Sequence, residues 1–148
     1  MLDDTQQNEL SQARALKAGG SVHDSDFECF RNMTCEEPTI IDVGANRDQS
    51  IVSFQAIFPQ AIVDSFEANP FFLPVLQDVG KWYEEVTIHT YGLGFTEDTL
   101  EFYVPVVDGR AYLEEGSTRR DSFEFDWVKE RLASYGTTLE FDIFPVEI

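Results

Sequence analysis

The chain has 148 residues, 43% of them hydrophobic and 13 of them phenylalanine, which is enough apolar material for one domain with a core. It carries 28 acidic and 10 basic residues, for a net charge of −18. The apolar content argues against global disorder. A surface this acidic repels phosphate backbones and anionic lipid, which argues against nucleic-acid partners and membrane surfaces. No apolar run approaches the ~20 residues that span a bilayer. The first residues lack the basic and apolar segments of a secretory signal, so we expect a cytoplasmic protein.

The first 37 residues predict a helical segment. A helix is expected over residues 3–18, because Asp3, Asp4 and Thr5 offer N-cap oxygens and Gly19-Gly20 can supply a left-handed stop. Its apolar face is thin, which favours peripheral packing. Phenylalanines at helical spacing predict a short packed turn or helix within residues 21–37. We therefore divide the chain into an N-terminal helical segment, 1–37, and a second part, 38–148.

Alternating strand and helix patterns follow between residues 39 and 91. Thr39–Val43 is a near-continuous apolar run, as expected for a strand buried on both faces of a parallel sheet. A broad apolar stripe over residues 48–58, closed by Pro59, predicts a helix. The same reasoning predicts a strand over 61–66, a helix over 71–83 and a strand over 86–91. This β-α-β-α-β order predicts an α/β fold of Rossmann-like type, with a parallel sheet and right-handed crossovers.

After Gly94 the sequence pattern changes and favours antiparallel strands. Thr99–Val107 alternates and is rich in β-formers, and Pro105 favours an edge position. Asp108-Gly109 is a strong turn signal, so we expect a β-hairpin insertion that returns through residues 110–113. A helix is predicted over 121–134, and a final strand over 139–148.

The stretch that points to chemistry joins the first strand to the helix after it. Asp42-Val43-Gly44-Ala45-Asn46 places a tight loop with small side chains at the carboxyl edge of the sheet. A ligand there lies close to backbone N–H groups and to a helix N-terminus. Glu67 ends the second strand, and its carboxylate can accept both hydrogen bonds from a ribose diol. Together these features predict a nucleoside-binding site.

The loop sequence distinguishes between nucleosides. The dinucleotide fingerprint requires G-x-G-x-x-G, whereas residues 44–49 read G-A-N-R-D-Q, and Asp48 would repel a bound phosphate. A nicotinamide-dependent oxidoreductase is therefore disfavoured. S-adenosylmethionine has no phosphate, and its ammonium and sulfonium groups favour a nearby carboxylate such as Asp42.

At these residues the sequence resembles the FkbM family of class I, S-adenosylmethionine-dependent methyltransferases. The first family motif is matched from Ile40 to Asn46 and at Ser50. The second appears as Phe66-Glu67-Ala68-Asn69-Pro70, and a small-Leu-Gly turn appears at Gly92-Leu93-Gly94. The resemblance spans roughly residues 38–148, and its specificity lies in the first two motifs.

The resemblance implies S-adenosylmethionine as cofactor and a small-molecule methyl acceptor, with transfer to an oxygen of a sugar or metabolite. It also implies roles for the matched residues. Asp42, Gly44 and Asn46 would face the methionine part, Glu67 the ribose, and Gly92-Leu93 the adenine. The expected cofactor-binding set is completed by Ala45, Ser50, Ala68 and Asn69. Placement of the acceptor supplies much of the rate in such enzymes, so no catalytic side chain is named.

The sequence departs from the family in two ways. Asp48 stands where the family has glycine, and an acidic residue at a helix start should be tolerated by the fold. The family also continues with strands absent from these 148 residues, including the one that pairs with the first strand. We therefore expect either a partial domain with an exposed apolar edge at Thr39–Val43, or a last strand that fills the gap. A non-catalytic remnant or interaction module is the alternative function.

The remaining polar candidates are weaker. Cys29 and Cys35 lack partners at zinc-site spacing, so we interpret them as free thiols and predict no metal site. His89 lies within a predicted strand, where a packed residue is favoured over a general base. The oligomeric state is left open.

Overall fold

The computed structural model describes residues 4–148, so Asp3, the first residue of the predicted N-terminal helix, lies outside the described part. The chain forms two compact units, Met1–Leu93 and Gly94–Ile148. The sequence-based boundary at residue 38 falls within the first unit. No helix in the described part is long and apolar enough to cross a membrane.

The first unit is built on a three-stranded parallel sheet. Its strands are β1 (Thr39–Val43), β2 (Ile62–Phe66) and β3 (Val86–His89), in the order β1-β2-β3. Thr39 pairs with Ile62, and Val63 pairs with Val86, both in parallel register. The predicted α/β fold of Rossmann-like type is therefore confirmed for this unit.

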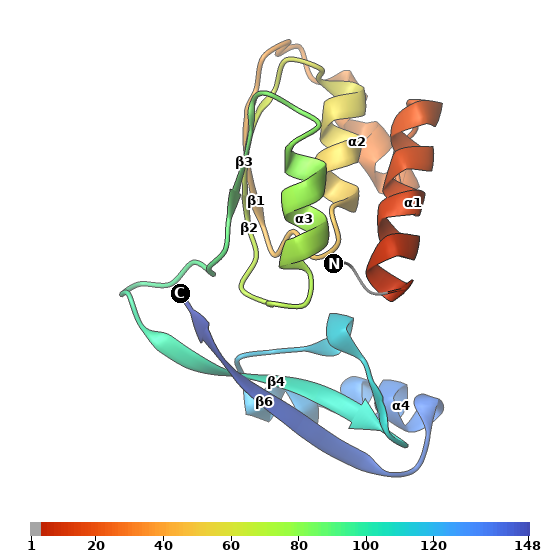
Figure 1. Ribbon diagram of the computed structural model, residues 1–148, viewed down its shortest axis with the longest axis vertical. Helices are drawn as coiled ribbons and strands as arrows, with labels where there is room; N and C mark the ends of the chain where they lie inside the picture. The colour runs from red at the N-terminus through yellow and green to blue at the C-terminus, as the bar shows by residue number, and fades with distance from the viewer. Residues whose placement is uncertain (1–3) are drawn as a thin grey trace. The chain divides into compact units, whose positions relative to one another are not determined.

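Three α-helices lie on one face of this sheet (Figure 1): α1 (Asp4–Gly19), α2 (Gln49–Ile57) and α3 (Leu73–Gly80). The apolar stripe of α2 is buried at Ile51 and Val52, and α3 buries Val75, Leu76 and Val79. The thin apolar face of α1 packs against α2 and α3, as predicted. Gly20 adopts φ +59°, the left-handed stop that follows α1. The 3₁₀ helix η1 (Ser25–Asn32) occupies the predicted packed turn.

The opposite face of the parallel sheet is open. Ile41 is 57% exposed, Val43 61% and Ile62 46%, so the expectation that Thr39–Val43 is buried on both faces is wrong. In Figure 1, α2 and α3 lie against one face of the sheet and α1 packs outside them, so alternate side chains of β1 stay in solvent on the other face. β1 is the terminal strand of the sheet, with β2 as its neighbour.

The second unit contains an antiparallel sheet in the order β5-β4-β6. β4 (Thr99–Val107) and β5 (Arg110–Ala111) form the predicted hairpin, with Asp108 and Gly109 at φ +49° and +80°. β6 (Leu139–Glu147) pairs with β4 from end to end, so it does not fill the place beside β1. The edge position predicted from Pro105 is wrong, because β4 is the central strand.

Short helices pack on this second sheet. The predicted helix over 121–134 is divided into a 3₁₀ helix, η3 (Arg120–Glu124), and α4 (Asp126–Tyr135), because Phe125 is extended with ψ 135°. Their core comprises Val107, Phe123, Val128 and Leu132. A further 3₁₀ turn, η2 (Leu113–Glu115), follows β5.

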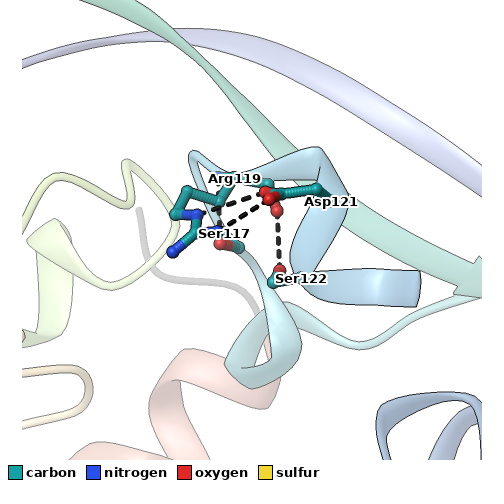
Figure 2. A network of polar contacts seen from close by, with 4 residues as sticks. All are labelled: Ser117, Arg119, Asp121 and Ser122. Carbon is teal, nitrogen blue, oxygen red and sulfur yellow. Dashed lines mark hydrogen bonds and ion pairs between the residues drawn. The ribbon is translucent and has the colours of Figure 1, made fainter. Parts of the chain in front are cut away.

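The start of η3 is organised by an exposed polar network (Figure 2). The Arg119 guanidinium donates to both carboxylate oxygens of Asp121, at 3.1 and 2.7 Å. The backbone N–H of Arg119 donates to Ser117 Oγ at 3.0 Å, and the carbonyl of Arg119 accepts from Ser122 Oγ at 2.6 Å. These contacts fix a local turn, and their exposure predicts little stabilisation.

Candidate functional site at the carboxyl edge of the parallel sheet

The loop between β1 and α2 is shaped by three left-handed residues. Gly44, Asn46 and Asp48 adopt φ values of +78°, +52° and +102°. The backbone N–H groups of Gly44 and Ala45 both donate to the carbonyl of Phe66, at 2.9 and 3.1 Å. The motif glycine is therefore required by its φ, and the loop is tied to the last residue of β2.

Glu67 joins this loop to the one that follows β2. Its Oε2 accepts from the backbone N–H of Asn46 at 2.8 Å, and its Oε1 accepts from that of Asn69 at 2.6 Å. Its own N–H donates to the carbonyl of His89 at 3.1 Å. Burial raises the pKa of Glu67, while the backbone hydrogen bonds from Asn69, Asn46 and Ala68 oppose that rise. Each carboxylate oxygen has a second lone pair, so acceptor capacity remains for a ligand.

Asp42 is held by two hydroxyl groups. Its Oδ2 accepts from Ser50 Oγ at 2.6 Å and from Ser65 Oγ at 3.2 Å. Ser50 comes from the first turn of α2, and Ser65 is the direct register partner of Asp42 across β1 and β2. Ser50 therefore orients the motif aspartate. Ser65 was not predicted, although a small hydroxyl residue opposite a strand-end aspartate was a usable signal.

The site has an unused acceptor and open space. Asn46 Oδ1 is buried and has no hydrogen-bond partner in the structure. A Cβ built at Gly44 would meet no atom within 4 Å, so a ligand has room to approach the backbone there. Asn69 is fully buried, and its Oδ1 accepts from the Phe71 N–H at 3.1 Å, which fixes the second loop.

The loop offers acceptors where a phosphate would need donors. Gly44, Ala45 and Asn46 use their N–H groups on Phe66 and Glu67, and Asp48 donates to the carbonyl of Ala45 at 3.2 Å. The carboxylates of Asp42 and Glu67 and the amide oxygen of Asn46 lie around this loop. Such an arrangement favours a neutral or cationic ligand over a phosphate.

Asp48 stands at the start of α2, as expected, but its side chain does not cap the helix. The residue is only 2% exposed. Its Oδ2 is buried without a hydrogen-bond partner. Burial, and to a smaller extent the Glu9 carboxylate, raise the pKa of Asp48 to about 7, while Arg47 opposes the rise. The left-handed φ of +102° explains why glycine suits this position.

An aromatic and acidic cluster lies at the ends of β2 and β3. The rings of Phe66 and His89 stack with centroids 4.2 Å apart. His89 Nε2 lies 2.8 Å from Asp64 Oδ1, and its Nδ1 lies 3.2 Å from the Tyr91 hydroxyl. Both ring nitrogens thus have partners, which fits the favoured interpretation of His89 as a packed residue.

The structure thus connects most of the predicted residues. Asp42 and Ser50 are linked directly, and Asn46, Glu67 and Asn69 form a second linked group. Ala45 and Ala68 lie in the two loops. Gly92 and Leu93 follow the end of β3, and Leu93 is 52% exposed. The backbone N–H of Glu67 donates to the carbonyl of His89, the last residue of β3. The roles of all these residues toward a ligand stay predictions.

The two cysteines named in the sequence analysis lie outside this site. Cys29 and Cys35 are free and exposed. Within residues 4–148, no group of three or more His, Cys, Asp or Glu side chains is arranged to hold a metal ion.

Comparison with known structures finds a partial similarity to a methyltransferase. The chain is similar to the crystal structure of Methyltransferase FkbM from Methylobacillus flagellatus KT, at 20% sequence identity and a TM-score of 0.41. The aligned part covers 44% of this chain and 20% of that chain, so this chain spans about a fifth of its length. No protein-family model matches the sequence, and no curated protein matches it. The fold class therefore rests on the pairing of β1, β2 and β3.

Proposed function

We propose that the chain binds S-adenosylmethionine at the carboxyl edge of β1 and β2, as the nucleoside-binding part of a methyltransferase. The observation that carries the proposal is the pair of loops joined by Glu67, one of which turns at Gly44 and holds Asp42 beside it. This places two carboxylates and an unpaired amide oxygen around an open loop.

The residues fit the cofactor in charge and in hydrogen bonding. Asp42, held in place by Ser50 and Ser65, offers negative charge to the ammonium and sulfonium groups. Asn46 Oδ1 is an acceptor without a partner, and the free lone pairs of Glu67 can accept from the ribose hydroxyls. Gly44 leaves space for close approach. When bound, S-adenosylmethionine would supply an electrophilic methyl group.

The same proposal covers the substrate that accepts the methyl group. We infer that it is a small molecule whose oxygen, on a sugar or metabolite, receives the methyl group. This part rests on the family resemblance of the two motifs, since the described residues do not distinguish one acceptor from another. Placing that oxygen in line with the methyl group is the expected source of rate.

Isothermal titration calorimetry tests cofactor binding. S-adenosylmethionine, and separately NAD, is titrated into the chain and into Asp42→Asn and Asn46→Gly, the latter keeping a residue that tolerates the left-handed φ. Asp78→Asn is the matched control, because Asp78 lies on α3 and pairs with Lys81 outside the site. We expect micromolar binding of S-adenosylmethionine alone, weakened at least about tenfold by each site variant, a loss of about 1.4 kcal/mol. Equal binding by all variants, or tighter binding of NAD, would contradict the proposal.

A non-catalytic interaction module is the second candidate, favoured by the open sheet face and the terminal position of β1. A folded chain that binds neither ligand would favour this candidate. Folding is checked on the same samples by circular dichroism.

A further inference from the structure

A cavity of about 200 Å³ lies between α1 and the start of α2 in the first unit. Its apolar wall includes Ala13 and Leu16, and its polar lining is formed by Glu9, Gln12, His23, Arg47, Asp48 and Gln49. Glu9 is 7% exposed and Asp48 2%, so two largely buried carboxyl groups line this space. We propose that this cavity binds a short primary alkylammonium ion.

The first argument is the surplus of negative charge. Arg47 Nε lies 3.0 Å from Glu9 Oε1, so the cation of this region is already paired with one carboxylate. Asp48 Oδ2 is buried and has no hydrogen-bond partner. When Asp48 is ionised, the group of Glu9, Arg47 and Asp48 carries one net negative charge, which a single monocation would neutralise.

The second argument concerns His23, which also lines the cavity. Ser53 Oγ has one hydrogen, which it donates to the carbonyl of Gln49 at 2.8 Å. It can therefore only accept from His23, whose N–H and Nδ1 lie 3.0 and 2.8 Å away. A neutral His23 consequently carries its proton on Nδ1 and presents the lone pair of Nε2 as an acceptor. The polar lining thus gains another acceptor suited to an N⁺–H donor.

The third argument is the strain at Asp48. A non-glycine residue at φ +102° stores backbone strain, and its carboxyl group makes no capping bond in return. The side chain instead reaches the cavity, where Ala13 and Leu16 form a wall for a short alkyl chain. An ammonium group with a short apolar stem matches both parts of the lining.

A proton on Asp48 competes with such a cation. The charged or titratable groups around Asp48 are Glu9 on α1, Arg47 beside it, Tyr83 after α3 and His23 before η1. Because the pKa of Asp48 lies at about 7, the ionised fraction, and with it the affinity, rises about tenfold from pH 6 to pH 8. Binding near pH 7 should release part of a proton.

The test is calorimetric titration of the whole chain with n-propylammonium chloride at pH 6 and pH 8, at constant ionic strength. Tetramethylammonium chloride has the charge without N–H donors, and n-propanol has the alkyl chain without the charge. We expect saturable binding of propylammonium alone, stronger at pH 8, with proton release seen as a heat that depends on the buffer.

Asp48→Asn keeps the side-chain shape and removes the charge. We expect it to weaken propylammonium binding at least about tenfold and to abolish the pH dependence. Asp78→Asn should bind as the wild-type chain does. Equal binding of tetramethylammonium, an unchanged affinity in folded Asp48→Asn, or no binding at pH 8 would overturn the proposal. S-adenosylmethionine binding by Asp48→Asn is measured in parallel, so that failure of one site is distinguishable from failure of the other.

Discussion

Two buried carboxyl groups on neighbouring parts of the first unit contrast sharply. Glu67 accepts two backbone N–H groups and thereby joins the loops that follow β1 and β2. Asp48, at the end of the first of these loops, has a buried oxygen without a partner and a left-handed backbone. Both are raised in pKa by burial. The comparison teaches that a buried carboxylate organises a site when backbone donors meet it, and destabilises the fold when they do not.

The largest expected effect is the loss of Glu67. Glu67→Ala leaves the N–H groups of Asn46 and Asn69 without their acceptor in a buried region, and each such group costs about 1–3 kcal/mol. We expect the free energy of unfolding to fall by about 3 kcal/mol in urea denaturation. Exposed Glu140→Ala is the control and should change little. A loss in Glu67→Ala no larger than in this control would refute the structural role of the carboxylate.

Asp48→Gly should raise the free energy of unfolding, in contrast to Glu67→Ala. Glycine relieves the left-handed strain and removes the buried carboxyl group, so we expect a stabilisation of about 2–3 kcal/mol at pH 8. The raised pKa means that the folded state holds its proton more tightly than the unfolded state. Stability linked to Asp48 is therefore lost as pH rises from about 4 to about 7.

The pH dependence sharpens this prediction. The gain from Asp48→Gly should be smaller at pH 5 than at pH 8, and Asp48→Asn should show the same trend while keeping part of the backbone strain. Urea denaturation at both pH values measures the difference. A gain independent of pH would mean that strain alone, without burial of charge, distinguishes Asp48 from glycine.

A smaller effect is expected at Asp42. Ser50→Ala removes a hydrogen bond of 2.6 Å to the carboxylate but leaves Ser65 in place. We expect a loss of about 1 kcal/mol in unfolding free energy, and weaker S-adenosylmethionine binding because Asp42 is no longer held from both sides. Thermal denaturation and calorimetry measure the two effects. Unchanged binding would show that Ser65 alone orients Asp42.

The smallest effect is expected at the exposed network of Figure 2. Arg119→Ala removes an ion pair with Asp121 whose two side chains are each about two-thirds exposed. Solvent and salt screen such pairs, so the denaturation midpoint should not change measurably. A clear loss of stability would show that the turn before η3 supports the second unit more than its exposure indicates.

Sequence patterns predicted the parallel unit well because its signals are local. Thr39–Val43 was placed correctly as a strand, and the stop at Gly20 follows from backbone preferences. The hairpin at Asp108-Gly109 in the second unit was predicted for the same reason. The exposure of Ile41 and Val43 was missed, since an apolar run gives no information on how many faces the neighbouring helices cover.

Other features depended on partners distant in the sequence. The pairing of β6 with β4, which makes Pro105 part of a central strand, is a long-range choice that alternation alone does not specify. Likewise, Asp48 follows the general preference for acids at helix starts, but its φ and its neighbour Glu9 on α1 are visible only in the folded chain. Ser65 became recognisable through its register with Asp42.

The most direct test of the proposed site is a ¹H–¹⁵N correlation spectrum of the chain titrated with S-adenosylmethionine. We expect the largest shifts at the amides of residues 42–46 and 66–69, with saturation in the micromolar range, and no comparable shifts at residues 9–16 of α1. Saturable shifts confined to other parts of the chain, or unchanged spectra of a folded sample, would contradict the assignment of a cofactor site to the carboxyl edge of β1 and β2.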